Sequence, residues 1–193
     1  MERTEAIVVE RAREGDADAF RELVESYSAK LFRLAWRITG DEQSAEDAVQ
    51  ETFLRAYRSL DRFDSRSQFG TWLHRIAVNA ALDLARKQQR HRARREDWPE
   101  EEAGGEPVPS PAPGPERIAL SLEVERAVRS GMAELSAMER TAFVLRHFEG
   151  RSIAEICEQL GLGASAGKQA IFRAVKKLRR VLEPLVQTQE ARL

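Results

Sequence analysis

Residues 152–180, SIAEICEQLGLGASAGKQAIFRAVKKLRR, predict two helices joined by a tight turn. Ser152 and Glu155 have the spacing of a capping box, which starts a helix by satisfying its free backbone N–H groups. Gly161 suits the left-handed conformation that ends such a helix, and Ser165 is placed to cap the next one. This pattern predicts a helix-turn-helix near the carboxyl end of the chain.

The second helix of this hairpin has two unlike faces. One face is apolar and carries Ile171, Ala174, Leu178 and Val181. The other carries Gln169, Phe172, Arg173 and Lys176, and every charged residue between Ala164 and Leu182 is Lys or Arg. A polar, basic helix of this kind is typical of major-groove recognition. The alternative is an ordinary amphipathic hairpin with a solvated charged face.

Charge is sorted along the chain, although the formal net charge of its 193 residues is only −1. Residues 86–95 contain no acid and residues 96–106 contain no base. One segment is suited to a polyanion and the other to a basic partner. Cys157 is the single cysteine, so an internal disulfide and a cysteine-based metal site are excluded, and we expect it to be a small core residue.

The chain is organised in three blocks. Residues 1–90 and 116–193 have helical periodicity, whereas residues 91–115 are rich in Pro, Gly and Glu and have almost nothing to bury. We therefore expect an all-α protein of two small helical domains joined by a flexible linker, with the helix-turn-helix in the second domain. Neither a signal-peptide pattern nor a run of transmembrane length is found, so we expect a cytoplasmic protein.

The first domain offers a second candidate surface for nucleic acid. A helix starting near Ser67 is expected to turn Arg75, Asn79, Leu82 and Arg86 away from its buried face. The aromatic residues that flank the preceding loop are Phe63, Phe69 and Trp72. Aromatic rings beside a basic helix stack on unpaired bases, but the same rings also suit the core of a small bundle.

The preceding helix has an acidic first half. The candidate residues there are Asp41, Glu42, Glu46, Asp47, Gln50 and Glu51. Acids near a helix start stabilise the helix dipole, and the same acids are also suited to docking a basic protein surface.

Three segments together resemble one known family. The runs SAEDAVQETFLRAYRSLDRF and FGTWLHRIAVNAALDLAR, and the hairpin ending in FRAVKKLRR, are similar to the extracytoplasmic-function (group IV) sigma factors of bacterial RNA polymerase. The resemblance covers both helical blocks. It implies a factor, not an enzyme and without a cofactor, that binds core RNA polymerase and directs initiation by recognising −10 and −35 promoter elements.

The resemblance also implies roles for individual residues. Contacts with the β′ clamp helices fall on Glu46, Asp47, Gln50, Glu51 and Phe53. Contacts with the −10 element fall on Phe63, Phe69, Trp72, Arg75, Asn79 and Arg86. Contacts with the −35 element fall on Ser165, Lys168, Gln169, Phe172, Arg173 and Lys176. The implied partners are core polymerase, including its β subunit, promoter DNA and an anti-sigma factor.

The recognition helix departs from the common family pattern at three positions. Ala170 and Val175 stand where Arg is common, and Gly167 stands where a buried Val is common. We expect Ala170 to lie on the flank of the DNA face and to remove a phosphate contact. We expect Gly167 to weaken the first turn, because Gly in a helix costs about 1 kcal/mol relative to Ala.

The sequence contains none of the enzyme motifs that we looked for. The run GASAGKQ lacks the first glycine and the final hydroxyl residue of a phosphate-binding loop, and a helix rather than a strand precedes it. His74, His91 and His147 do not have metal-ligand spacing, and we expect His74 and His147 to be partly buried. Two other functions stay open: a stand-alone helix-turn-helix regulator, and a sigma mimic that titrates an anti-sigma factor.

Overall fold

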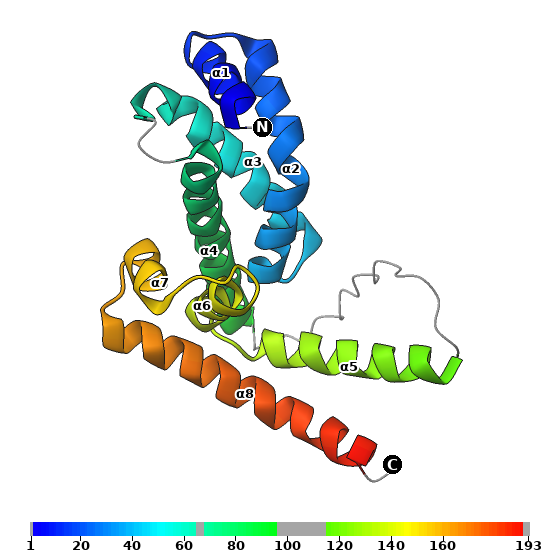
Figure 1. Ribbon diagram of the computed structural model, residues 1–193. Helices are drawn as coiled ribbons and strands as arrows, with labels where there is room; N and C mark the ends of the chain where they lie inside the picture. Colours follow the sequence, from blue (N-terminus) through cyan, green and yellow to red (C-terminus); the bar gives the residue numbers. More distant parts are fainter. Residues whose placement is uncertain (1, 65–67, 96–114, 191–193) are drawn as a thin grey trace. The chain divides into compact units, whose positions relative to one another are not determined.

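The computed structural model describes residues 2–64, 68–95 and 115–190, and all its regular elements are helices (Figure 1). The elements are α1 (Glu2–Arg13), α2 (Ala17–Thr39), α3 (Glu42–Ser59), the 3-10 helix η1 (Leu60–Arg62), α4 (Phe69–Arg95), α5 (Pro115–Ala133), α6 (Ala137–His147), α7 (Ile153–Leu160) and α8 (Ala164–Glu190). The all-α prediction is confirmed. The chain divides into two compact units, residues 1–91 and 92–193.

Local sequence sets the helix starts in the first unit. Gly15 has a φ of 96°, and Asp16 caps α2 by accepting hydrogen bonds from the backbone N–H groups of Asp18 and Ala19. The Ala19 bond, followed by the Arg11 side chain, lowers the pKa of Asp16. Gly40, with a φ of 85°, ends α2. Asp at a helix start and Gly at a helix end are residue types preferred at these cap positions.

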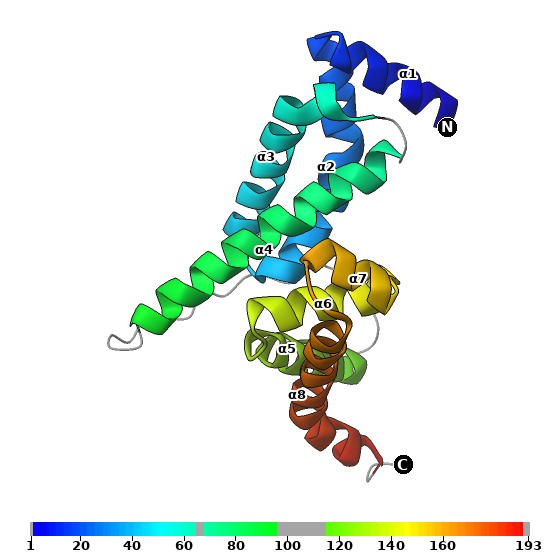
Figure 2. The same cartoon turned by 90° about the vertical axis from the view of Figure 1, so that its left-hand side faces the viewer.

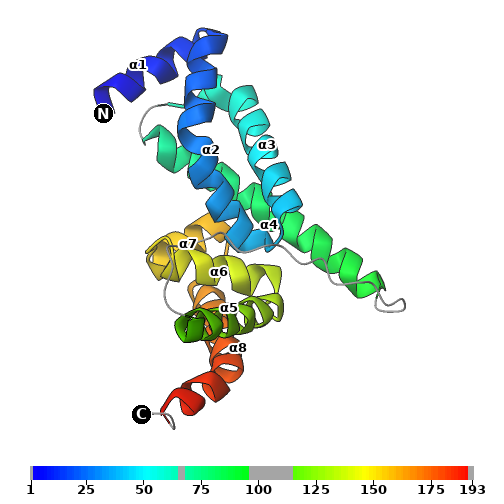
Figure 3. The same ribbon diagram turned by 90° about the vertical axis from the view of Figure 1, so that its right-hand side faces the viewer.

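The core of the first unit lies between α2 and α3, with α1 packed on α2 (Figure 3). α2 contributes buried Leu23, Leu31, Leu34 and Ile38. α3 contributes mainly small side chains, Ala45, Ala48 and Ala56, which allow the two helices to approach closely.

Helix α4 crosses α2 and α3 (Figures 2 and 3). Its Gln88 amide hydrogen-bonds to Asp41 and Ser44 at the start of α3, and Arg55 lies 3.4 Å from Asp83. The helix continues to Arg95, so residues 91–95, which we placed in the linker, are helical. Arg and Ala favour helix, and no Gly or Pro interrupts the run before Pro99. At the other end of the predicted linker, Pro115 is the first residue of α5, and residues 96–114 lie outside the described residues.

In the second unit, α5, α6 and α7 each pack against α8. Ser136 and Glu139 form a capping box at the start of α6. The same Glu139 carboxylate accepts a hydrogen bond of 2.7 Å from Lys177 of α8. A single carboxylate therefore starts α6 and fixes it to the recognition helix.

Candidate functional site

The predicted helix-turn-helix is formed by α7 and α8. Ser152 and Glu155 form the capping box of α7, and Gly161 ends the helix with a φ of 64°. The N–H of Leu162 then donates to the carbonyl of Cys157 at 2.8 Å, which closes the turn. The hairpin prediction is confirmed in these details.

Helix α8 begins one residue earlier than its predicted cap. Its first residue is Ala164, so Ser165 lies within the first turn and the prediction that it caps the helix is wrong. The carbonyl of Gly163 accepts the N–H of Gly167 at 3.0 Å, so the backbone starts the helix without a side-chain cap. Ser165 remains exposed on the first turn.

The two faces of α8 separate as predicted. The exposed side chains include Lys168, Gln169, Phe172, Arg173 and Lys176, and Phe172 is 68% exposed. Ala174 and Leu178 are buried on the opposite face. Ala170 is also buried, at 8% exposure, so its predicted place on the flank of the DNA face is wrong.

A close contact between α7 and α8 explains Gly167. A Cβ atom added at residue 167 would clash with the Sγ atom of Cys157. The thiol is buried, as predicted, and lies 3.7 Å from the carbonyl oxygen of Gly163. The cysteine therefore occupies the space that a larger residue 167 would need, which the sequence of α8 alone did not reveal.

Helix α4 presents a polar row in the first unit. Arg75, Asn79 and Arg86 are exposed, as predicted. Leu82, which we placed on the same face, is only 4% exposed and belongs to the core. The buried face of α4 is therefore wider than the spacing of apolar residues in the sequence indicated, and it includes Leu82.

The aromatic residues around the loop before α4 form a cluster. Phe63 and Phe69 are 5% and 4% exposed, with ring centres 5.7 Å apart. The half-buried Trp72 lies 5.1 Å from Phe63 and 5.6 Å from Phe69. The two phenylalanines thus have the core role that we left open as the alternative, whereas Trp72 remains partly accessible.

Helix α3 carries the acidic surface. Glu46, Asp47 and Gln50 project from it, and all three side chains are exposed. Glu51 is half-buried, and its carboxylate lies 2.6 Å from Arg55, which raises the pKa of that guanidinium. Glu42 is exposed as well, so the first half of α3 presents three carboxylates to solvent, with the Gln50 amide beside them.

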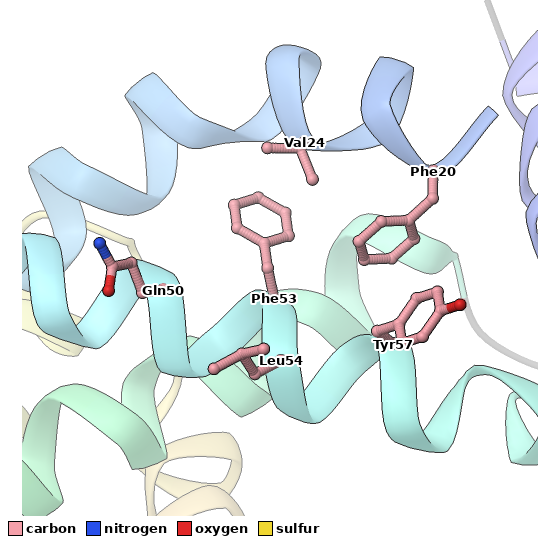
Figure 4. Close-up of a pocket in the computed structure, with 6 residues that line it drawn as sticks. All are labelled: Phe20, Val24, Gln50, Phe53, Leu54 and Tyr57. Atoms are coloured by element: carbon pink, nitrogen blue, oxygen red, sulfur yellow. The ribbon is translucent and has the colours of Figure 1, made fainter. Parts of the chain in front are cut away.

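An apolar groove lies beside this acidic surface. Figure 4 shows the side chains of α2 and α3 that line it: Phe20, Val24, Gln50, Phe53, Leu54 and Tyr57. Phe53, predicted as a direct contact, is only 8% exposed and forms part of the wall. Leu54 and Tyr57 are 50% and 59% exposed and were missed by the sequence reasoning. Leu54 follows Glu51 by three residues and Tyr57 follows Leu54 by three, so the helical period places them near the acids; that spacing was the available signal.

The described residues offer neither a metal site nor a membrane span. Within ranges 2–64, 68–95 and 115–190, no group of three or more His, Cys, Asp or Glu is arranged to hold a metal ion. No helix there is both long enough and apolar enough to span a membrane. His74 is buried, as expected, whereas His147 is exposed beside Phe143 because it lies in the last turn of α6.

Comparison with known proteins identifies the family. Residues 23–91 match Sigma-70 region 2, and residues 125–178 match Sigma-70, region 4. The chain is 33% identical over 185 residues to ECF RNA polymerase sigma factor SigW of Bacillus subtilis, covering 92% of this chain and 96% of the relative. The chain belongs to the ECF sigma factors. It is likewise 36% identical over 182 residues to RNA polymerase sigma-H factor of Pseudomonas aeruginosa, covering 93% and 94% of the two chains.

Solved structures agree with this family. CnrH, in complex with the cytosolic domain of CnrY, matches with a TM-score of 0.59 at 29% identity over 92% of this chain and 96% of CnrH. The sigma factor RpoE of Bartonella quintana, in complex with the anti-sigma factor NepR, shares the fold at a TM-score of 0.62 and 22% identity, covering 85% and 96% of the chains. This sigma factor therefore binds core RNA polymerase and directs promoter-specific transcription initiation, and it is not an enzyme.

Proposed function

We propose that this sigma factor divides its work among three separate surfaces. The exposed face of α8 reads the −35 element, the polar row of α4 with Trp72 recognises the −10 element, and the acidic face of α3 with its apolar groove binds the β′ clamp helices. The observation that carries this assignment is the segregation of charge among exposed faces. α8 is cationic and without an acid up to Leu182, whereas the exposed turns of α3 around Glu46 and Asp47 are acidic.

The α8 face has the chemistry that the −35 role needs. Lys168 and Lys176 are suited to phosphates, which position the helix on the duplex. Gln169 and Arg173 are suited to base edges in the major groove, where an amide pairs with adenine and a guanidinium with guanine. Phe172 supplies apolar surface for a thymine methyl group.

The α4 row has the chemistry that the −10 role needs. Asn79 presents both a donor and an acceptor for a base edge, and Arg75 and Arg86 flank it with positive charge. Trp72 offers a partly exposed ring for stacking on an unpaired base. Phe63 and Phe69 support that ring rather than contact DNA.

The α3 surface combines charge with apolar area. Glu46 and Asp47 attract a basic partner, and Gln50 lies at the border between the acids and the groove. Leu54 and Tyr57 add exposed apolar surface to be covered by a helix of the clamp. Acids at the rim and apolar side chains beside them are typical of a protein interface.

Transcription reconstituted with core polymerase and a promoter of this factor tests the three roles separately. Gln50→Ala with Tyr57→Ser is expected to lower affinity for core polymerase, Asn79→Ala to lower open-complex formation, and Arg173→Ala to lower binding of −35 duplex by the holoenzyme. Arg129→Ala is the matched control, because Arg129 lies on α5 and pairs with Glu125 on the protein surface. A sigma mimic predicts that Asn79→Ala and Arg173→Ala change nothing, and that result would contradict the proposal.

The same surfaces suit a regulatory partner. CnrH and the Bartonella factor were each solved in complex with a partner protein, and the partner of the Bartonella factor, NepR, is named as an anti-sigma factor. We infer that this chain acts in the cytoplasm and is held inactive there by an anti-sigma factor that covers its binding surfaces. Affinity purification of the full chain from its host is expected to recover such a protein, and recovery of polymerase subunits alone would contradict the inference.

A further inference from the structure

Buried aromatic rings fix both ends of the loop before α4. Phe63 precedes the loop and Phe69 follows it, and their rings meet edge to face at an interplanar angle of 87°. Trp72 lies against both rings. The position of the accessible tryptophan therefore depends on how this pair of phenylalanines is held.

Tyr27 of α2 holds the pair from outside the loop. Its ring lies 5.7 Å from that of Phe69, and its hydroxyl donates a hydrogen bond to the carboxylate of Glu5 in α1. The backbone of α4 approaches the same ring closely. A Cβ atom added at Gly70 would lie 2.8 Å from the hydroxyl oxygen of Tyr27 and 3.1 Å from its Cε1 atom. The tyrosine fits there because residue 70 is glycine.

Helix α1 also reaches the other end of the loop. It packs against η1, whose last residue Arg62 directly precedes Phe63. Val8, Val9 and Ala12 anchor α1 to the unit by being buried. The match to Sigma-70 region 2 begins only at residue 23, so α1 lies outside it.

We propose that α1 is a positioning element for −10 recognition, acting through Glu5, Tyr27 and Phe69 to place Trp72. This inference rests on the −10 role proposed above for α4 and its preceding ring cluster. A ring held in its binding position before DNA arrives loses less freedom on binding, so the support of α1 raises affinity without touching the DNA.

The test uses the holoenzyme and a single-stranded non-template −10 oligonucleotide, taken from a promoter on which that holoenzyme initiates. Tyr27→Phe and Glu5→Ala each remove the hydrogen bond, while an aromatic ring at position 27 still faces Phe69. Each is expected to lower the affinity for the oligonucleotide by about 3- to 10-fold, the scale of one lost hydrogen bond. The double variant is expected to lose no more than either single variant, because both remove one interaction.

Glu10→Ala is the matched control on the same helix. Glu10 is exposed and pairs with Arg13 at the surface, so its loss is expected to leave oligonucleotide binding unchanged. Binding to core polymerase and to −35 duplex is measured in parallel for every variant. A positioning role lowers −10 binding alone.

Gly70→Ala is a second, independent variant. For it, helix propensity and the contact with Tyr27 predict opposite results. Alanine is the better helix former, so propensity alone predicts a more stable protein with normal binding. The contact with Tyr27 instead predicts displacement of its ring and a loss of −10 affinity of at least about tenfold, because the ring cluster shifts as well as losing its hydrogen bond.

The outcomes separate this inference from the proposed function. Wild-type holoenzyme that fails to bind the oligonucleotide overturns the −10 assignment and this inference with it. Wild-type binding that Tyr27→Phe, Glu5→Ala and Gly70→Ala leave unchanged overturns the role of α1 alone. An equal loss of −10, −35 and core-polymerase binding in these variants also overturns it, because the cause is then general unfolding.

Discussion

At the scale of single residues, Gly167 is explained by its neighbour rather than by its helix. Gly167→Ala improves helix propensity by about 1 kcal/mol, but its methyl group clashes with Cys157 Sγ. Overpacking of this kind costs roughly 1–3 kcal/mol, so we expect a net loss of stability. Urea unfolding of Gly167→Ala, Cys157→Ala and the double variant measures it. The double variant should be more stable than Gly167→Ala alone, and a Gly167→Ala protein more stable than the parent would contradict the explanation.

Tyr57 supports a second prediction at this scale. Its side chain is 59% exposed yet borders the apolar groove, where its ring meets that of Phe20 edge to face. Tyr57→Ser is therefore expected to weaken core-polymerase binding by about tenfold or more while lowering the free energy of unfolding by no more than about 1.5 kcal/mol, the scale of the lost ring pair. Fluorescence anisotropy with labelled core polymerase and urea unfolding measure the two quantities. Ile7→Ser is the control, because Ile7 is 61% exposed but lies outside the groove. Equal binding by both variants would remove the groove from the interface.

At the scale of elements, Glu139 connects α6 to the recognition helix. Burial raises the pKa of its carboxyl, but hydrogen bonds from Lys177 and from the backbone of Ser136 outweigh that effect, and the pKa lies below its usual value of 4.5. A lowered pKa in the folded state means that the ionised form stabilises the fold. That contribution is complete above the usual pKa and is lost as the pH falls through the folded-state pKa.

Glu139→Gln is therefore expected to lower the free energy of unfolding by roughly 1–3 kcal/mol at pH 7. The difference from the parent should shrink as the pH is lowered below 4.5, where the parent carboxylate becomes protonated. Glu134→Gln serves as the control, because its ion pair with Arg180 is at the surface and contributes little. Urea unfolding across this pH range measures the difference in the free energy of unfolding between Glu139→Gln and the parent. A difference that stayed constant with pH would contradict a stabilising role for the ionised Glu139 carboxylate.

At the scale of the whole molecule, the chain has two compact units, each with a candidate DNA surface. Two weak contacts on separate units gain most affinity when their spacing matches that of the two sites, and we expect core polymerase to supply that constraint. We expect the holoenzyme to bind promoter duplex roughly 10²- to 10⁴-fold more tightly than the chain alone at equal salt. Electrophoretic mobility shifts with and without core polymerase measure the ratio. Equal affinity would favour a stand-alone regulator's mode of binding.

Much of the fold was predictable because helix starts and stops depend on a few adjacent residues. Ser152 and Gly161 cap the two ends of α7 as the sequence indicated, since a cap involves only the backbone within one turn. The basic face of α8 was predictable for the same reason, because helical period alone places its side chains together.

Which of those side chains reach solvent was decided by packing between distant segments. Phe53, Leu82 and Ala170 are buried by neighbours that their own helices do not specify, whereas Leu54 and Tyr57 are left exposed. Tyr27 meets Glu5 and Phe69, and Cys157 meets Gly167, across turns and helices. The sequence by itself therefore determined the helices and their polar faces through local hydrogen bonding. The tertiary structure alone decided the groove, the aromatic cluster and the hydrogen bond that joins Tyr27 to Glu5 of α1, because burial depends on the surfaces that meet when helices pack.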